Sequence, residues 1–167
     1  GVTDVSNSDG GIGVYAEKTT ISGTGATITV GNNGLGFYAN DSDVNFTGLN
    51  MNLHGDNALG FYLDGNTDFT ASGNIDIAGR NVILFNVLSS GTFTNNLTVN
   101  SSAGSSYIIG NINNGTFNYD GIIDLASNGT LINGRNSAVL LNTASQLNST
   151  GTNVVGVALN GQGTPDP

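Results

Sequence analysis

One short segment of the chain returns twice with little change. It is Gly-Ile-Gly-Val-Tyr-Ala-Glu at 11–17, Gly-Leu-Gly-Phe-Tyr-Ala-Asn at 34–40 and Ala-Leu-Gly-Phe-Tyr-Leu-Asp at 58–64. Its first apolar position recurs in steps of 23 or 24 residues along the chain, at Ile12, Leu35, Leu59, Ile83, Tyr107, Leu131 and Val155. Such a regular return indicates a solenoid, in which each repeat packs only on its neighbours.

Each repeat contains three runs in which apolar residues alternate with other residues. Alternation of this kind predicts a β-strand with one buried face. Three strands of ~5 residues, joined by polar corners rich in Gly, Asn, Ser and Asp, account for a repeat of ~24 residues. The sequence therefore predicts an all-β fold, a single-stranded parallel β-helix of about seven coils with three short strands per coil.

Equivalent residues of successive coils in a parallel β-helix stack at ~4.8 Å, so the repeat predicts ladders. Two aromatic ladders are expected to fill the interior, the first with Phe37, Phe61 and Phe85 and the second with Phe46, Phe69, Phe93 and Phe117. A third ladder is expected at one corner, with Asn33, Asn57, Asn81 and Asn153, interrupted by Ser105 and Gly129. Asparagine suits a corner because it tolerates the left-handed backbone and its stacked amides can hydrogen-bond along the axis.

The pattern loosens between residues 107 and 136, where apolar residues occupy both faces of the expected strands. If the earlier register continued, Asn133 and Arg135 would be buried. An unpaired buried arginine is very costly, so we expect a bulge or a shifted strand in this region.

The composition excludes several classes of function. The 167 residues include 12 acidic residues but only 3 basic ones, Lys18, Arg80 and Arg135, and the formal net charge is −9. Nucleic-acid binding and electrostatic docking on an anionic membrane both need a positive surface, which this chain lacks. Cysteine is absent, so strand ladders and a stacked interior must hold the fold without disulfides.

We expect three segments along the chain. Residues 1–10 complete a preceding coil, residues 11–160 hold the repeats, and residues 161–167 form a turn or linker because two prolines remove ladder donors. Neither a signal peptide nor a capping helix is evident, so the chain is expected to be a fragment of a longer protein.

The repeats Gly-Ile-Gly-Val-Tyr-Ala and Gly-Asn-Asn-Gly-Leu-Gly-Phe-Tyr-Ala, separated by Thr/Ser/Asn-rich strands, suggest a family. They resemble the passenger repeats of large type V (classical, monomeric) autotransporter adhesins, especially those of fusobacteria. The resemblance covers most of residues 10–160 as a style of repeat and is specific in the first three coils. It implies a right-handed β-helix that is displayed on the bacterial cell surface or secreted. It further implies adherence to a host cell-surface protein or glycan, or to other bacteria. It transfers no functional residue.

The outward face of the first strand is the candidate binding surface. Three tyrosines flanked by glycines and followed by polar acceptors would form a shallow platform for a sugar or a partner's loop: Tyr15, Tyr38 and Tyr62 with Glu17, Asn40 and Asp64. The alternative is that the tyrosines stack outward only because aromatic residues favour strand surfaces.

A few polar residues could instead serve catalysis or metal binding. Asp76 and Asp124, two coils apart, and Arg80 would be the residues of a β-helical polysaccharide lyase or hydrolase if they converged in a cleft. His54, the only histidine, stands without other strong ligands, and the corner aspartates lack the Gly-Gly-x-Gly-x-Asp calcium repeat. We therefore expect no cofactor, no metal and no catalysis. The segment is expected either to bind a partner itself or to act only as a spacer for binding residues in other coils.

Overall fold

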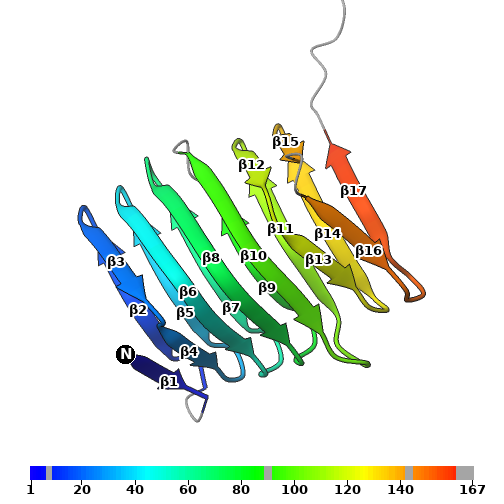
Figure 1. The fold of residues 1–167 in the computed structure, drawn as a ribbon, viewed down its shortest axis with the longest axis horizontal. Helices are drawn as coiled ribbons and strands as arrows, with labels where there is room; N and C mark the ends of the chain where they lie inside the picture. Colours follow the sequence, from blue (N-terminus) through cyan, green and yellow to red (C-terminus); the bar gives the residue numbers. More distant parts are fainter. Residues whose placement is uncertain (7–8, 89–91, 142–144, 161–167) are drawn as a thin grey trace, which may run out of the picture.

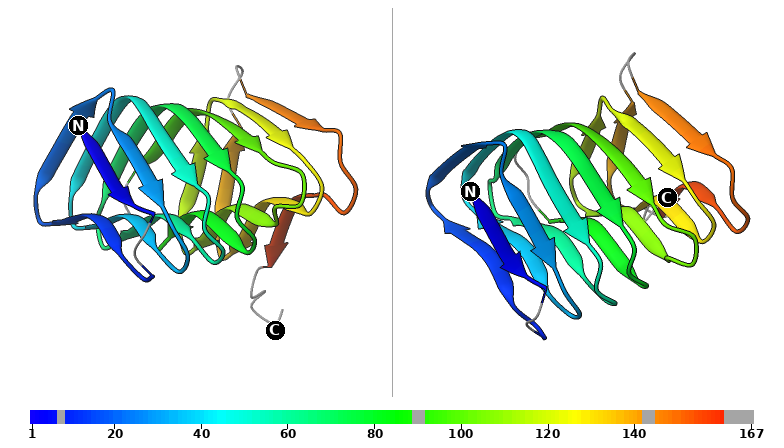
Figure 2. Two further views of the ribbon diagram at one scale, coloured as in Figure 1. Left: turned by 90° about the horizontal axis from the view of Figure 1, so that it is seen from below. Right: turned by 60° about the horizontal axis from the view of Figure 1, so that its bottom comes forward.

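The chain folds as an all-β parallel solenoid of about 6 turns of ~24 residues. The computed structural model describes residues 1–6, 9–88, 92–141 and 145–160, and these contain strands, turns and bends but no helix, hence none that could span a membrane. Two parallel sheets form the layers of the flattened coil, and the first and last strands lie at opposite ends of the stack (Figures 1 and 2). The predicted fold class is confirmed. The predicted segment 161–167 lies outside the described residues, and right-handed coiling stays a prediction.

The first strand of each repeat contributes to one seven-stranded sheet. Its members, in spatial order, are β2 (Ile12–Glu17), β5 (Leu35–Asn40), β7 (Leu59–Asp64), β9 (Val82–Val87), β11 (Tyr107–Asn113), β14 (Gly129–Arg135) and β17 (Val155–Asn160).

The remaining strands form a ten-stranded sheet. They are β1 (Val2–Val5), β3 (Thr20–Thr24), β4 (Thr27–Val30), β6 (Asp43–Leu53), β8 (Asp68–Ile77), β10 (Phe93–Ser101), β12 (Thr116–Tyr119), β13 (Ile122–Leu125), β15 (Ala138–Leu141) and β16 (Gln146–Ser149). Strand β1 pairs with β4, so the first residues occupy the place of a third strand in a preceding coil.

The prediction of three short strands per coil is right only toward the two ends of the solenoid. In the central coils the second and third strands are continuous, as β6, β8 and β10 of 11, 10 and 9 residues. The expected corner is replaced by a register irregularity between Phe46 and Leu49, next to the positive-φ residues Gly48 and Gly73. A bulge of this kind bends a strand without ending its pairing, which explains the merger.

Two phenylalanine ladders face each other across the dry interior. Phe61 and Phe85 stack with centroids 5.0 Å apart, as do Phe69 and Phe93 at 5.1 Å. Across the interior, Phe85 meets Phe93 edge-on at 4.8 Å. Phe37 and Phe117 extend the two ladders at 6.1 Å and 5.1 Å from their neighbours. Aromatic contact and area burial therefore join the two sheets.

The prediction that Phe46 belongs to the second ladder is wrong. Strand pairing places Val44 beside Phe69 and Phe46 beside Ala71, because the coil from Asp43 to Asp68 is one residue longer than the average repeat. Phe46 instead meets the edge of the ring of Phe37 at 5.6 Å.

The corner asparagine ladder is confirmed in the first coils. Asn33, Asn57 and Asn81 all have left-handed backbones, with φ of 54°, 57° and 55°. The Asn57 amide donates to Asn33 Oδ1 at 3.0 Å, and the Asn81 amide to Asn57 Oδ1 at 3.3 Å. Asn153 also has positive φ, and its ladder partner is Asn128 at 3.3 Å, so the interruption predicted at Gly129 does not occur.

The strands after β9 are shifted in register, which confirms the irregularity expected between residues 107 and 136 and explains the change in the asparagine ladder. The residue in register with Ile83 is Ile108, where Tyr107 was expected, and the next one is Thr130, where Leu131 was expected. The shifts leave Asn133 and Arg135 exposed and place apolar neighbours inside. The desolvation cost of a buried arginine is thereby avoided.

Candidate functional site

The outer face of the seven-stranded sheet holds three parallel columns of side chains, which we name by their content. The Tyr/Asn column consists of Tyr15, Tyr38, Tyr62, Asn86, Asn111, Asn133 and Ala158. The acid/amide column includes Glu17, Asn40, Asp64, Asn113, Arg135 and Asn160. The aliphatic column consists of Ile12, Leu35, Leu59, Ile83, Ile108, Thr130 and Val155.

The three predicted tyrosines lie side by side in the first half of the Tyr/Asn column. Tyr15 and Tyr38 stack with centroids 4.9 Å apart and an interplanar angle of 8°, and Tyr38 and Tyr62 stack at 5.5 Å and 20°. The rings therefore cover one another's faces, and the surface that reaches solvent consists of ring edges and hydroxyls. Only Tyr15, which is 59% exposed, has a neighbour on one side alone.

The hydroxyls of Tyr15 and Tyr38 remain neutral hydrogen-bonding groups. Tyr15 donates to Glu17 Oε2 at 2.9 Å, and this bond is the main cause that raises the pKa of Tyr15 above its ordinary value. The pKa of Tyr38 is raised first by desolvation and then by nearby acidic groups, among them Asp64. The phenols of Tyr15 and Tyr38 thus present an O–H and lone pairs to a ligand at neutral pH, as a sugar hydroxyl or an amide requires.

An amide ladder continues the tyrosine stack. The side-chain amide of Asn111 donates to Asn86 Oδ1 at 2.7 Å, and that of Asn133 donates to Asn111 Oδ1 at 3.2 Å. This ladder was not predicted, because the unshifted register of residues 107–136 would bury Asn133 and gives no indication of where the chain shifts. The sequence contained one indication of this ladder, because Asn86 follows Phe85 in the same way that Tyr62 follows Phe61 one repeat earlier.

The first apolar position of each repeat was expected inside, and this is wrong for Ile12, Leu35, Leu59, Ile83 and Val155, which belong to the aliphatic column of the outer face. Tyr107 and Leu131 of the same expected series are buried. Ile12 is 53% exposed, and Leu35 is only half-buried. Gly36 takes the inward place, where an added Cβ would point at Met51 and Val30, and Phe37 next to it is also fully buried. Two successive inward residues reverse the alternation, so the preceding aliphatic side chain turns outward.

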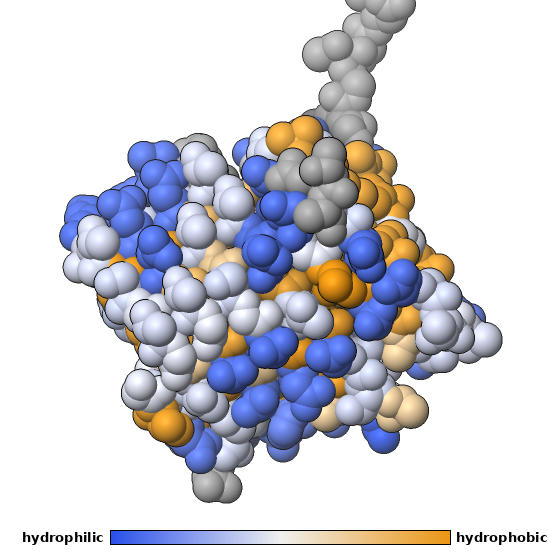
Figure 3. Space-filling view, viewed as in Figure 1, coloured by the Kyte–Doolittle hydropathy of each residue, from blue (hydrophilic) through white to orange (hydrophobic). Residues whose placement is uncertain are grey.

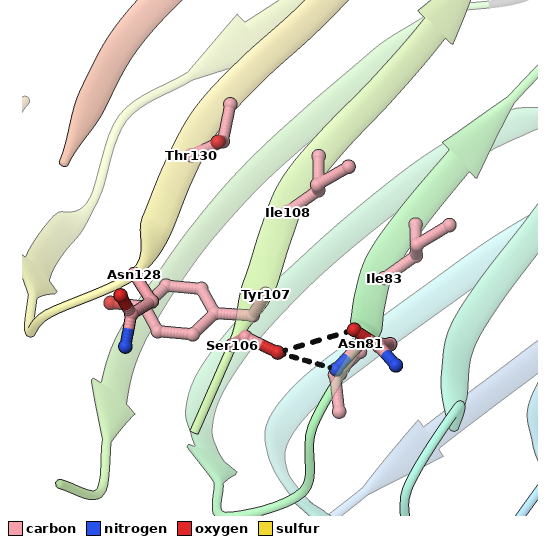
Figure 4. A pocket seen from close by; sticks show the side chains of 8 residues that line it. Asn81, Ile83, Ser106, Tyr107, Ile108, Asn128 and Thr130 are labelled. Atoms are coloured by element: carbon pink, nitrogen blue, oxygen red, sulfur yellow. Dashed lines mark hydrogen bonds between the residues drawn. The ribbon is translucent and has the colours of Figure 1, made fainter. Parts of the chain in front are cut away.

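A shallow cavity of about 360 Å³ lies beside this column on β9, β11 and β14. Ile83, Ile108 and Thr130 stand in a row along it (Figure 4). At one end, Ser106 Oγ accepts a hydrogen bond from the Asn81 backbone N–H at 2.8 Å (Figure 4). The cavity thus combines an apolar row with a polar end.

A second cavity, of about 300 Å³, opens on β11, β14 and β17. Its polar lining comes from both outward polar columns: Asn111, Asn113, Asn133, Arg135 and Asn160. Register places Arg135 between Asn113 and Asn160, so its guanidinium lies among amides rather than carboxylates.

The carboxylates weighed for catalysis lie along a flat ladder of the other sheet. Asp76 pairs in register with Asn100, and Asp124 pairs with Asn148. Asp76 Oδ2 lies 3.0 Å from His54 Nε2, and the Asn148 amide donates to Asp124 Oδ1 at 2.7 Å. Arg80 belongs to the corner between β8 and β9, where its backbone N–H donates to Asp56 Oδ1. Asp76 and Arg80 thus belong to one coil, on a strand and at a corner, and Asp124 lies two coils further along the ladder; none of the three lines a described cavity.

The corner aspartates are used as backbone acceptors between coils. Asp41 accepts the N–H of Asn66 at 2.9 Å, and Asp68 accepts that of Thr92 at 2.6 Å. Within the described residues, no group of three or more His, Cys, Asp or Glu side chains is arranged to hold a metal ion.

Apolar side chains are also exposed at the end of the solenoid where β17 lies (Figure 3). Leu141, Val157 and Leu159 are 50%, 43% and 54% exposed there, although they are in register with buried residues of the preceding coil, because no further coil covers them in this structure.

Comparisons with family models, with curated proteins and with solved structures found no match to this chain. The molecule is therefore identified by its fold alone, as a β-solenoid without an assigned family.

Proposed function

We propose that this chain is a non-enzymatic segment of a bacterial surface-exposed or secreted adhesin passenger, which mediates or extends adhesion to host cells or to other bacteria. The observation that carries the proposal is the outer face of the seven-stranded sheet, where stacked tyrosines pass without a break into a ladder of asparagines. The resemblance of the first three coils to autotransporter passenger repeats supports the same assignment.

The physical character of this face suits recognition of a glycan or a protein strand on another cell. Tyrosine hydroxyls and asparagine amides offer donors and acceptors at every coil, and sugar hydroxyls need both. The aliphatic column beside them adds apolar contact area, as the half-buried Leu35 and Leu59 illustrate. A ladder-bonded solenoid holds these groups on a rigid surface, which lowers the entropy lost on binding.

One observation favours a second candidate, a structural spacer whose binding residues lie in other coils. The tyrosine rings cover one another's faces, and stacking of this kind stabilises neighbouring strands whether or not a ligand binds. The two candidates differ in whether this segment itself binds cells.

Binding of this chain to intact epithelial and bacterial cells tests the proposal. The wild type is compared with a Tyr15/Tyr38/Tyr62→Ser variant and with a control on the opposite face, Asn45/Thr70/Thr94→Ser, whose members share one column of the ten-stranded sheet. Circular dichroism establishes that the three proteins are equally folded. Saturable binding that is lost only in the tyrosine variant supports adhesion through this face. Absence of cell binding by the wild type overturns the proposal that this chain is adhesive, and the structural spacer is then the remaining candidate.

A further inference from the structure

The cavity on β11, β14 and β17 has a chemistry that differs from the rest of the outer face. The first half of the acid/amide column carries Glu17 and Asp64, while the second half carries Arg135. Arg135 is exposed and forms no ion pair with any residue that the structure describes. In a chain with 12 acidic and 3 basic residues, it is a positive group set apart among amides.

The amide ladder beside Arg135 leaves an acceptor unused. Each amide donates toward the preceding coil, from Asn133 to Asn111 and from Asn111 to Asn86. The next residue of the column is Ala158, which has no side-chain donor. Asn133 Oδ1 therefore accepts no hydrogen bond from the described part of the chain, and it borders the same cavity as Arg135.

We infer that this cavity is a subsite for the carboxylate of an acidic saccharide. The guanidinium of Arg135 has the planar pair of N–H donors that binds a carboxylate in bidentate fashion. Asn133 Oδ1 is an acceptor for a sugar hydroxyl, and the neighbouring Asn113 and Asn160 supply further amide groups. The inference rests on the proposed function, since it names the class of ligand that the adhesive face would take.

The surroundings favour a saccharide over an acidic peptide. The lining of the cavity is mainly amide and guanidinium, and Ile112 is its one large apolar residue. Peptide side chains gain much of their affinity from apolar anchors, whereas a saccharide is held by many hydroxyl contacts. The cavity volume of about 300 Å³ is at the lower end of small-ligand sites and suits a few sugar rings at most.

The test is a titration of the purified protein with an oligouronide and with a sialylated oligosaccharide. The same saccharides with their carboxyl groups reduced to alcohols serve as neutral ligands. Calorimetry measures affinity, and NMR of the asparagine side-chain amides reports the location of binding. Arg135→Gln is compared with Arg80→Gln, a control that removes one exposed arginine at a corner outside the cavity. A soluble polyglutamate tests whether an acidic peptide binds instead of a saccharide.

We expect Arg135→Gln to weaken binding of the acidic saccharide by at least about tenfold and Arg80→Gln to leave it nearly unchanged. The reduced saccharide should bind the wild type and Arg135→Gln with equal affinity. Of the oligouronide and the sialylated oligosaccharide, the one that binds the wild type more tightly identifies the source of the carboxylate. Absence of acidic-saccharide binding, equal loss in both arginine variants, or tighter binding of polyglutamate would each overturn the inference. Cell binding that persists without saccharide binding would reject this subsite alone, whereas saccharide binding without cell binding would reject the adhesive function.

Discussion

The ring of Phe85 lies nearly parallel to that of Phe61, with centroids 5.0 Å apart and an interplanar angle of 15°. Both rings are fully buried at the centre of the solenoid. Phe85→Ala is expected to lower the free energy of unfolding by ~3–5 kcal/mol, because it removes buried area and leaves a cavity between the sheets. Urea unfolding followed by circular dichroism measures the loss. A cost below ~1 kcal/mol would mean that the interior is not packed around this ladder.

Gly55 lies at a corner where the backbones of successive coils touch. A Cβ at this position would overlap the backbone of Gly31 and Asn32, and Gly79 stands against Gly55 in the same way one coil later. Gly55→Ala is therefore expected to destabilise the fold by ~3 kcal/mol, since the clash is with backbone that cannot move aside easily. The control is Gly156→Ala, where an added Cβ meets no atom within 4 Å and thermal unfolding should barely change. Similar melting temperatures for both variants would contradict the close approach.

Asn57 combines a left-handed backbone with a place in the amide ladder. Asn57→Gly and Asn57→Ala both lose the side-chain hydrogen bonds, but alanine keeps a Cβ and glycine does not. A Cβ in the left-handed region costs ~1–2 kcal/mol, which the short polar side chain of asparagine offsets by local hydrogen bonds and alanine cannot. The alanine variant should accordingly be the less stable of the two in chemical denaturation. The reverse order would show that the corner backbone is not left-handed in solution.

Asn95 is a polar residue within the aromatic interior. It is fully buried, its amide donates to the carbonyl oxygen of Asn118 at 3.2 Å, and its Oδ1 has no partner among the described residues. An unsatisfied buried acceptor costs ~1–3 kcal/mol, so Asn95→Leu is expected to raise the unfolding free energy by ~1 kcal/mol. The exposed neighbour offers a control, Asn96→Leu, which should have little effect. Clear destabilisation by Asn95→Leu would mean that the bond to Asn118 outweighs the unpaired oxygen.

The fold was predictable because one period repeats in the aromatic positions. Phe61 and Phe85 stack as their spacing indicates, and Asn33 and Asn57 form the expected corner bond. Phe46 could not be placed in the same way. Its coil contains an additional residue, and the alternation alone does not show where the chain absorbs it. Register within a coil depends on such local bulges, which composition does not specify.

The candidate site was predictable only in part. The three tyrosines are evident from the repeated pair of Val14 or a phenylalanine followed by tyrosine, and strand pairing places them side by side. The amide ladder and the position of Arg135 depend on two one-residue register shifts, at Ile108 and at Thr130. A shift of one residue exchanges the inner and outer faces of a strand, so the later half of the outer face required the three-dimensional structure.

The proposed function places adhesion on the outer face of the seven-stranded sheet. The chain has no cysteine, so single labels can be attached at Asn86→Cys on this face and at Asn96→Cys on the opposite sheet of the same coil. Each variant is joined to a bulky polyethylene glycol maleimide, and its binding to cells is measured against the unlabelled protein. We predict that the polymer at position 86 abolishes binding and that the polymer at position 96 leaves it intact. Unchanged binding with the label at 86, or loss only with the label at 96, would contradict the assignment.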